Sequence, residues 1–180
     1  MVALNYGAAM VYPSEAFEPR AALEAVSQEK CAALYGVPTM FIAMLEELKI
    51  MENVDTENLR TGIAAGSLVP KPLMERIINE MGLDEMTICY GQTETGPVSF
   101  QSFTDTPLDE KVSSVGLVHP NVEAKVVDKD GNIVANGVQG ELAVRGYLVM
   151  SKYWNDPEKT AEVIDDDKWC YSGDLATIDE

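Results

Sequence analysis

The fold of this chain is decided by the stretch at residues 90–97, Tyr-Gly-Gln-Thr-Glu-Thr-Gly-Pro. It follows directly on the short apolar run 86–90, which predicts a buried β-strand. The polar residues then stand at the carboxyl end of that strand. In open α/β sheets this is the edge at which ligands bind. We therefore take this stretch as the first candidate site.

The residue types in this stretch suit a nucleotide and a metal ion. Tyr90 offers a flat ring on which a base can stack, and Gly91 lets the backbone approach a ligand closely. Thr93 brings a hydroxyl donor for a phosphate oxygen, and Glu94 is a hard oxygen ligand of the kind that Mg²⁺ prefers. The same residues could also form a polar turn that closes a strand, and the octapeptide alone does not separate the two readings.

The first half of the chain alternates between strand and helix patterns, which predicts an α/β layer with parallel strands. Prolines near the starts of the last two predicted helices and Gly82 after the last of them are typical helix boundaries. The expected strands are 3–12, 31–34, 59–65 and 86–90, and the expected helices are 19–29, 39–48 and 70–81.

The second half reads as mainly β. Short apolar runs predict strands at 115–118, 122–127, 133–134 and 141–145, with one helix at 157–163. The Asp-Gly pair inside 128–132 predicts a hairpin turn. The polar segment 104–114 is the expected boundary, so we divide the chain into an α/β segment, 1–104, and a mainly β segment, 105–180.

Composition narrows the possible partners. The chain has 180 residues and a formal charge of −17, which argues against nucleic acid as a partner because phosphate binding needs a positive surface. No apolar run reaches the roughly 20 residues of a membrane span. The three isolated cysteines indicate free thiols in a reducing compartment. The methionine-rich stretches are expected to fill the core.

Two further segments carry candidate ligand residues. A predicted strand ends in small residues around Gly66 and Ser67, which leave room for a flat ring against the backbone. Asp174 follows a glycine at the expected start of a strand, and its carboxylate could accept hydrogen bonds from both hydroxyls of a ribose. A tight strand–helix turn and a loop aspartate that caps backbone amides are the respective alternatives.

Taken together, the ordered segments resemble the adenylate-forming superfamily, which includes acyl-CoA synthetases, luciferase-like enzymes and adenylation domains. YGQTETG resembles the nucleotide motif of this family, and GELAVRGYLVMSKYW and YSGDLA resemble its next two motifs. The likeness is greatest to the fatty-acyl-CoA synthetase branch, and the chain is similar to its medium- and long-chain members, the medium-chain ones in particular. The resemblance implies an acetyl-CoA-synthetase-like α/β fold, in which the C-terminal part of a doubly wound α/β subdomain is followed by part of a β-barrel subdomain.

The resemblance also implies a role for each candidate residue. Thr93 and Glu94 would be catalytic, Thr93 binding the α-phosphate and Glu94 holding Mg²⁺. Asp174 would hold the ribose hydroxyls, while Arg145 and Trp154 would brace the β half. The remaining implied contacts with ATP or AMP are Gly66, Ser67 and Leu68 lining the adenine, Tyr90 stacking on it, and Gly91 and Gln92 near the acyl end.

The implied enzyme is an AMP-forming fatty acid–CoA ligase. A fatty-acid-like carboxylate reacts with ATP to give acyl-AMP, and the thiol of CoA then forms the thioester. We expect the chain to be an internal fragment that is inactive alone, because the family's phosphate loop and its C-terminal lysine would lie outside it. Alternatives are an enzyme that passes the acyl group to a carrier protein, and a non-catalytic nucleotide-binding segment. The cytoplasm and the mitochondrial matrix both fit, and the sequence leaves the oligomeric state open.

Overall fold

The computed structural model describes residues 2–179, and the chain forms two compact units. Unit 1 comprises Met1–Ile88 and Ser102–Ser114, and unit 2 comprises Cys89–Gln101 and Val115–Glu180. The polar segment expected to separate two subdomains contains α5 (Leu108–Ser113), which belongs to unit 1. The division at residues 104 and 105 stays a prediction about subdomains.

Unit 1 is built on parallel strands, as the alternating pattern predicts. β1 (Ala33–Gly36) pairs in parallel with β2 (Thr61–Ala65), and β3 (Glu85–Tyr90) lies next to β2. A side chain at Gly62 would place its Cβ 2.0 Å from the carbonyl oxygen of Leu34, so only glycine fits there. The last two residues of β3 belong to unit 2, and β3 thus carries the chain out of unit 1.

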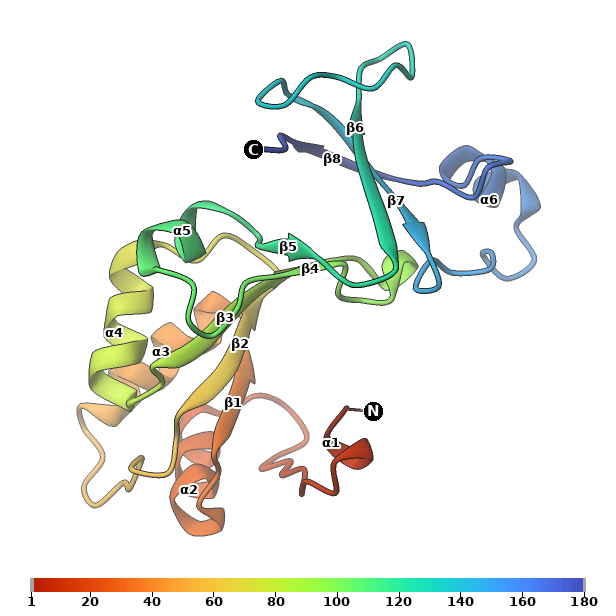
Figure 1. Cartoon of the computed structure of the whole chain (residues 1–180). Helices are drawn as coiled ribbons and strands as arrows, with labels where there is room; N and C mark the ends of the chain where they lie inside the picture. Colours follow the sequence, from red (N-terminus) through yellow and green to blue (C-terminus); the bar gives the residue numbers. More distant parts are fainter. Residues whose placement is uncertain (1, 180) are drawn as a thin grey trace. The chain divides into compact units, whose positions relative to one another are not determined.

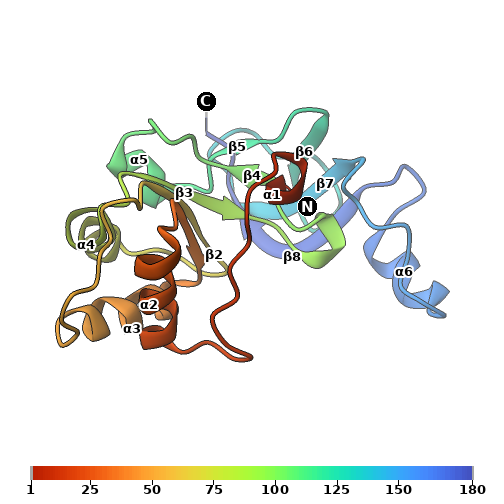
Figure 2. The same ribbon diagram turned by 90° about the horizontal axis from the view of Figure 1, so that it is seen from below.

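Three helices and the strands of unit 1 enclose one apolar core. α2 (Pro19–Glu29) and α3 (Pro38–Leu48) each begin at a proline, and α4 (Lys71–Met81) ends at Gly82 in the left-handed conformation. Figure 2 shows α2, α3 and α4 grouped together beside the strands of this unit. The expectation that methionines fill the core is confirmed for four fully buried ones, Met44, Met74, Met81 and Met86.

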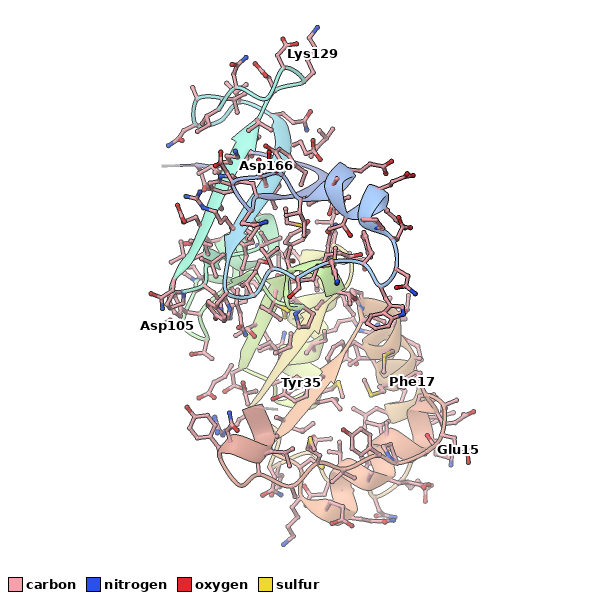
Figure 3. The ribbon with its side chains drawn as sticks, turned by 90° about the vertical axis from the view of Figure 1, so that its right-hand side faces the viewer. Glu15, Phe17, Tyr35, Asp105, Lys129 and Asp166 are labelled. Carbon is pink, nitrogen blue, oxygen red and sulfur yellow. The ribbon has the colours of Figure 1, made fainter. Side chains whose placement is uncertain are left out.

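The strand expected at 3–12 is wrong. α1 (Val2–Asn5) occupies the start of this stretch, and the segment that follows is irregular up to α2. An isolated apolar segment needs a neighbouring strand to satisfy its backbone groups, and no strand pairs with it within residues 2–179. The side chains of the irregular segment before α2 lie on the surface. Figure 3 labels two of them, Glu15 and Phe17.

Unit 2 holds the antiparallel strands. The end of β3 pairs with β4 (Phe100–Gln101), which pairs with β5 (Leu117–Val118). β6 (Val122–Val127), β7 (Gly140–Gly146) and β8 (Cys170–Ala176) form a second sheet in that order, and α6 (Pro157–Val163) lies beside β8 (Figure 1). Buried Val122, Val126, Leu142 and Val144 form the core of this sheet.

The local predictions for unit 2 are mostly confirmed. The Oδ1 of Asp128 accepts from the backbone N–H groups of Asp130 and Asn132, both at 2.9 Å, and so closes the expected turn. Lys129 points outward at its tip (Figure 3). The strand expected at 133–134 is wrong, because only a single bridge joins Ile133 to Val127.

Candidate functional site

The stretch at 90–97 forms a loop that is fixed by its own hydrogen bonds. η1 (Thr93–Thr95) is a single turn of 3-10 helix that follows β3. The backbone N–H of Gln92 donates to Thr95 Oγ1 at 3.1 Å, and the N–H of Thr95 donates back to the Gln92 carbonyl at 2.9 Å. Ser99, fully buried, donates its hydroxyl to Thr95 Oγ1 at 2.9 Å. The loop is therefore a polar turn of defined shape, and the candidate side chains project from it.

Gly91 has a structural reason that the sequence does not reveal. A Cβ at this position would lie 2.0 Å from the carbonyl oxygen of Pro97 and 2.9 Å from the Cα of Val98. The backbone at the start of the loop therefore lies very close to the backbone at its end. This close approach requires glycine at position 91, whether or not a ligand binds there.

Two of the predicted residues meet at the carboxylate of a third, which lies more than 80 positions further along the chain. The Tyr90 hydroxyl donates to Asp174 Oδ2 at 2.6 Å, and the Gln92 side-chain amide donates to the same oxygen at 3.0 Å. The Gln92 amide also donates to the Ser172 carbonyl at 2.9 Å. Burial of the ring, and then the bond to Asp174, raise the pKa of Tyr90 to about 12. Tyr90 is therefore a neutral donor at physiological pH.

The backbone of β8 sets the place of Asp174, which lies inside the strand and not at its start as expected. An irregularity in register between β7 and β8 falls opposite this point. Ser172 Oγ donates to the Leu142 carbonyl at 2.8 Å and accepts the N–H of Asp174 at 3.1 Å. Gly173 adopts a left-handed φ of 74°. The Asp174 carboxylate is exposed, with Oδ2 engaged by two donors and Oδ1 turned to neither of them.

A second contact joins Glu94 to a residue that our sequence reasoning did not single out. The Tyr153 hydroxyl donates to Glu94 Oε1 at 2.8 Å, and the N–H of Met150 donates to the Glu94 carbonyl at 2.8 Å. Three contacts lower the pKa of Glu94. The bond from the Tyr153 hydroxyl has the largest effect, and a backbone N–H and the positive charge of Lys159 add to it. Glu94 is thus ionised and held, and the exposed Thr93 precedes it in the chain.

Glu94 suits a metal that takes most of its ligands from elsewhere. Within residues 2–179, no group of three or more His, Cys, Asp or Glu side chains is arranged to hold a metal ion. Mg²⁺ is commonly bound by one or two carboxylates together with substrate phosphates and water. One half-buried, ionised carboxylate beside a hydroxyl fits that pattern, and it does not fit a site built from protein ligands alone.

Glu94 and Gln92 open onto a hollow of about 320 Å³ in unit 2. Its other lining residues come from the segment around α6 and from β8. They are Tyr153, Val163, Cys170, Tyr171 and Ser172. The only available signal for Tyr153 was its place inside a segment that resembles a family motif.

The other predicted residues lie as follows. Gly66, Ser67 and Leu68 are exposed at the end of β2 in unit 1. Arg145 forms a two-pronged ion pair with Glu123 and lies 4.5 Å from the centre of the Trp169 ring, in keeping with a bracing role.

The expectation that Trp154 braces the β half is wrong, because 85% of its surface is exposed. Trp154 lies in a turn of the segment between β7 and α6.

Comparison with known proteins places these observations in a family. A sequence model described as "AMP-binding enzyme" matches residues 1–154. Acyl-CoA ligase sidI of Aspergillus fumigatus is 45% identical over 100% of this chain and 31% of its own length. Medium-chain acyl-CoA ligase ACSF2, mitochondrial, of Danio rerio is 46% identical over 97% of this chain and 29% of its own. The chain thus spans less than a third of these curated relatives.

Solved structures agree in fold. O-succinylbenzoate coenzyme A synthetase (MenE) from Bacillus subtilis, in complex with AMP, matches with a TM-score of 0.82 and 26% identity, over 99% of this chain and 35% of that one. The amide bond synthetase McbA from Marinactinospora thermotolerans matches with a TM-score of 0.80 and 29% identity, over 93% of this chain and 33% of that one. Both chains extend well beyond the matched part.

Proposed function

Because this chain belongs to the AMP-binding enzyme family, we propose that the protein carrying it is an acyl-CoA ligase that activates a fatty-acid-like carboxylate with ATP. In this proposal the carboxylate attacks the α-phosphate of ATP, acyl-AMP and pyrophosphate form, and the CoA thiol then displaces AMP to give the thioester. The names of the curated relatives support the class of reaction. The α/β fold shared with an AMP-bound structure supports the use of the nucleotide.

The meeting of Tyr90, Gln92 and Asp174 carries the proposal. Two donors hold Oδ2 of Asp174, so the carboxylate has one preferred orientation and Oδ1 is available. A carboxylate oriented in this way can accept from vicinal hydroxyls, as a ribose presents. We assign Asp174 to the ribose and the Tyr90 ring to the adenine. Gly66, Ser67 and Leu68 are kept as adenine contacts, and Gly91 and Gln92 as residues near the acyl end, on the family resemblance alone.

Thr93 and Glu94 are assigned to the reacting phosphate. The exposed Thr93 hydroxyl would donate to an α-phosphate oxygen, and Glu94, whose pKa is lowered, would hold Mg²⁺. When bound, the metal supplies positive charge at the phosphates, where negative charges meet during the attack. The chain itself carries an excess of 17 negative charges. We propose that the cationic help for the first step comes mainly from the metal and from parts of the protein beyond these residues, and that the 180 residues are inactive alone.

The test is acid-dependent exchange of radioactive pyrophosphate into ATP by the full-length gene product, with straight-chain fatty acids of increasing length. We expect exchange with at least one acid. Glu94→Gln should reduce the rate by about 100-fold or more, because the metal loses its charged ligand. Glu162→Gln, which removes an exposed acid on α6, is the matched control and should retain the rate of the unmodified protein. No exchange with any acid would refute the proposal.

The acceptor and the compartment need separate measurements. Thioester formation with free CoA supports the ligase, whereas transfer only to a carrier-protein thiol would favour the alternative enzyme.

Within residues 2–179, no helix is both long and apolar enough to cross a membrane. The cytoplasm and the mitochondrial matrix stay open as proposals, and fractionation of cells that express the full gene would separate them. The name of the Danio rerio relative describes that protein as mitochondrial.

A further inference from the structure

The contact between Tyr153 and Glu94 is a feature that the proposed reaction does not yet use. The two residues are 59 positions apart, and the phenol reaches Glu94 Oε1 at 2.8 Å. Both line the same hollow in unit 2. A hydroxyl that donates to one carboxylate oxygen limits rotation of the carboxylate and turns its second oxygen in a fixed direction.

α6 in turn holds Tyr153 in place. Asp156 caps the helix, its side chain accepting the N–H of Lys159 at 2.9 Å. The hydroxyl of Thr160 donates to the Asp156 carbonyl at 2.7 Å and accepts the backbone N–H of Tyr153 at 3.0 Å. The Lys159 ammonium lies 4.8 Å from the centre of the Tyr153 ring. Backbone and ring of Tyr153 are therefore both fixed by the first turn of α6.

We propose that Tyr153, held by α6, is a positioning residue that orients the Glu94 carboxylate toward a nucleotide-bound divalent cation. This inference rests on the proposed function, because it takes Glu94 as the metal ligand. Tyr153 itself touches neither the metal nor the reacting atoms in this account. It acts through Glu94, as hydrogen-bonded partners of metal ligands generally do.

Two segments that are far apart in the sequence meet at Glu94. The loop at 90–97 carries Glu94, while the segment before α6 binds both its backbone carbonyl, through the N–H of Met150, and its side chain, through Tyr153. Neither segment could orient the carboxylate alone, because a glutamate has three side-chain torsions that its own backbone leaves free.

The experiment measures metal-dependent nucleotide affinity, which does not require turnover. The full-length gene product is titrated calorimetrically with α,β-methylene-ATP, once with Mn²⁺ and once with EDTA. The ratio of the two dissociation constants reports how much the metal contributes. Tyr153→Phe should reduce this ratio about tenfold or more, the usual loss when a partner of a metal ligand is removed. The affinity measured in EDTA should stay within about twofold of the unmodified protein.

Two controls separate positioning from a general structural effect. Tyr147→Phe removes a phenol that is 74% exposed in the segment before Tyr153, and it should leave the ratio unchanged. In a Glu94→Gln background, Tyr153→Phe should cause no further loss, because the residue through which it acts has already lost its charge. An equal additional loss in that background would overturn the proposal.

Stability and function are also kept apart. If Tyr153→Phe fails to fold, as judged by circular dichroism, Thr160→Val replaces it. That variant keeps the phenol but removes the acceptor of its backbone N–H, and it should lower the ratio by a smaller factor of about threefold. An unchanged ratio in the folded variant would overturn the inference and leave the proposed function standing. Absence of nucleotide binding by the unmodified protein would refute both.

Discussion

Removal of the Tyr90 hydroxyl tests the contact that joins the first and last motifs. Tyr90→Phe keeps the ring, which packs edge-on against Phe100 with centroids 6.0 Å apart, and deletes only the donor to Asp174 at 2.6 Å. Hydrogen bonds to charged groups contribute about 1.5–3 kcal/mol to stability. Asp174 is exposed and keeps the Gln92 amide, so water can replace the phenol. We expect the free energy of unfolding to fall by about 1.5 kcal/mol at pH 7, at the lower end of that range.

The pH dependence gives this prediction its second half. The folded chain holds the pKa of Tyr90 at about 12, above its usual value of 10.0. A pKa that is raised in the folded state stabilises the fold below the unfolded pKa, and this stabilisation is lost as the pH rises through the folded pKa. Each pKa unit corresponds to about 1.4 kcal/mol, so the loss between pH 10 and pH 12 cannot exceed about 3 kcal/mol. Solvent at the partly exposed ring reduces it further.

Urea unfolding at pH 7, 10 and 12 measures both effects. The difference in unfolding free energy between the unmodified protein and Tyr90→Phe should be about 1.5 kcal/mol at pH 7. It should fall above pH 10, where only the unmodified protein has a phenol to ionise, and it can change sign by pH 12. Tyr147→Phe, which removes an exposed phenol, should change stability by less than about 0.5 kcal/mol at every pH. Equal stabilities at pH 7, or a difference that is constant up to pH 12, would refute the reasoning.

Four further substitutions test the packing of each unit. Gly91→Ala should destabilise unit 2 by about 3 kcal/mol, because its Cβ would stand 2.0 Å from the Pro97 carbonyl. Gly131→Ala is the control: nothing lies within 4 Å of the added Cβ, so it should cost only about 1 kcal/mol for the left-handed φ of 83°. If thermal denaturation showed equal losses for Gly91→Ala and Gly131→Ala, the close approach of the loop backbone at Gly91 would be contradicted. Met74→Ala should cost unit 1 about 2–5 kcal/mol in urea unfolding, since the side chain is fully buried, and a smaller loss would mean that the core collapses around the gap. Arg145→Met should cost less than about 1 kcal/mol at 0.15 M salt, because its ion pair is largely exposed; a larger loss would assign the guanidinium a role beyond bracing.

Much of the local structure follows from the sequence. Helical spacing together with prolines and Gly82 places α2, α3 and α4 to within a residue, because a helix is specified by contacts three and four positions apart. The 128–132 turn follows from its Asp-Gly pair, because its hydrogen bonds also join residues that are close together in the sequence. The strand at 3–12 fails because a strand depends on a partner that its own residues do not specify.

The candidate site divides along the same line. The residues of the 90–97 loop and Asp174 could be identified from residue type and order in the chain, because each carries a chemical group that a nucleotide or metal would use. The sequence by itself also determined the family resemblance, since the resembling motifs keep their order along the chain. It could assign Asp174 to a hydroxyl pair only by analogy.

Only the tertiary structure decided which of these groups touch. It brought Tyr90 and Gln92 onto one oxygen of Asp174, and it placed the unnoticed Tyr153 on Glu94. It also showed that position 91 must be glycine because the backbone of Pro97 lies against it. These contacts join residues on different strands and loops. Their distances depend on how the β-sheet and α6 of unit 2 pack, and no pattern within a single segment encodes that arrangement.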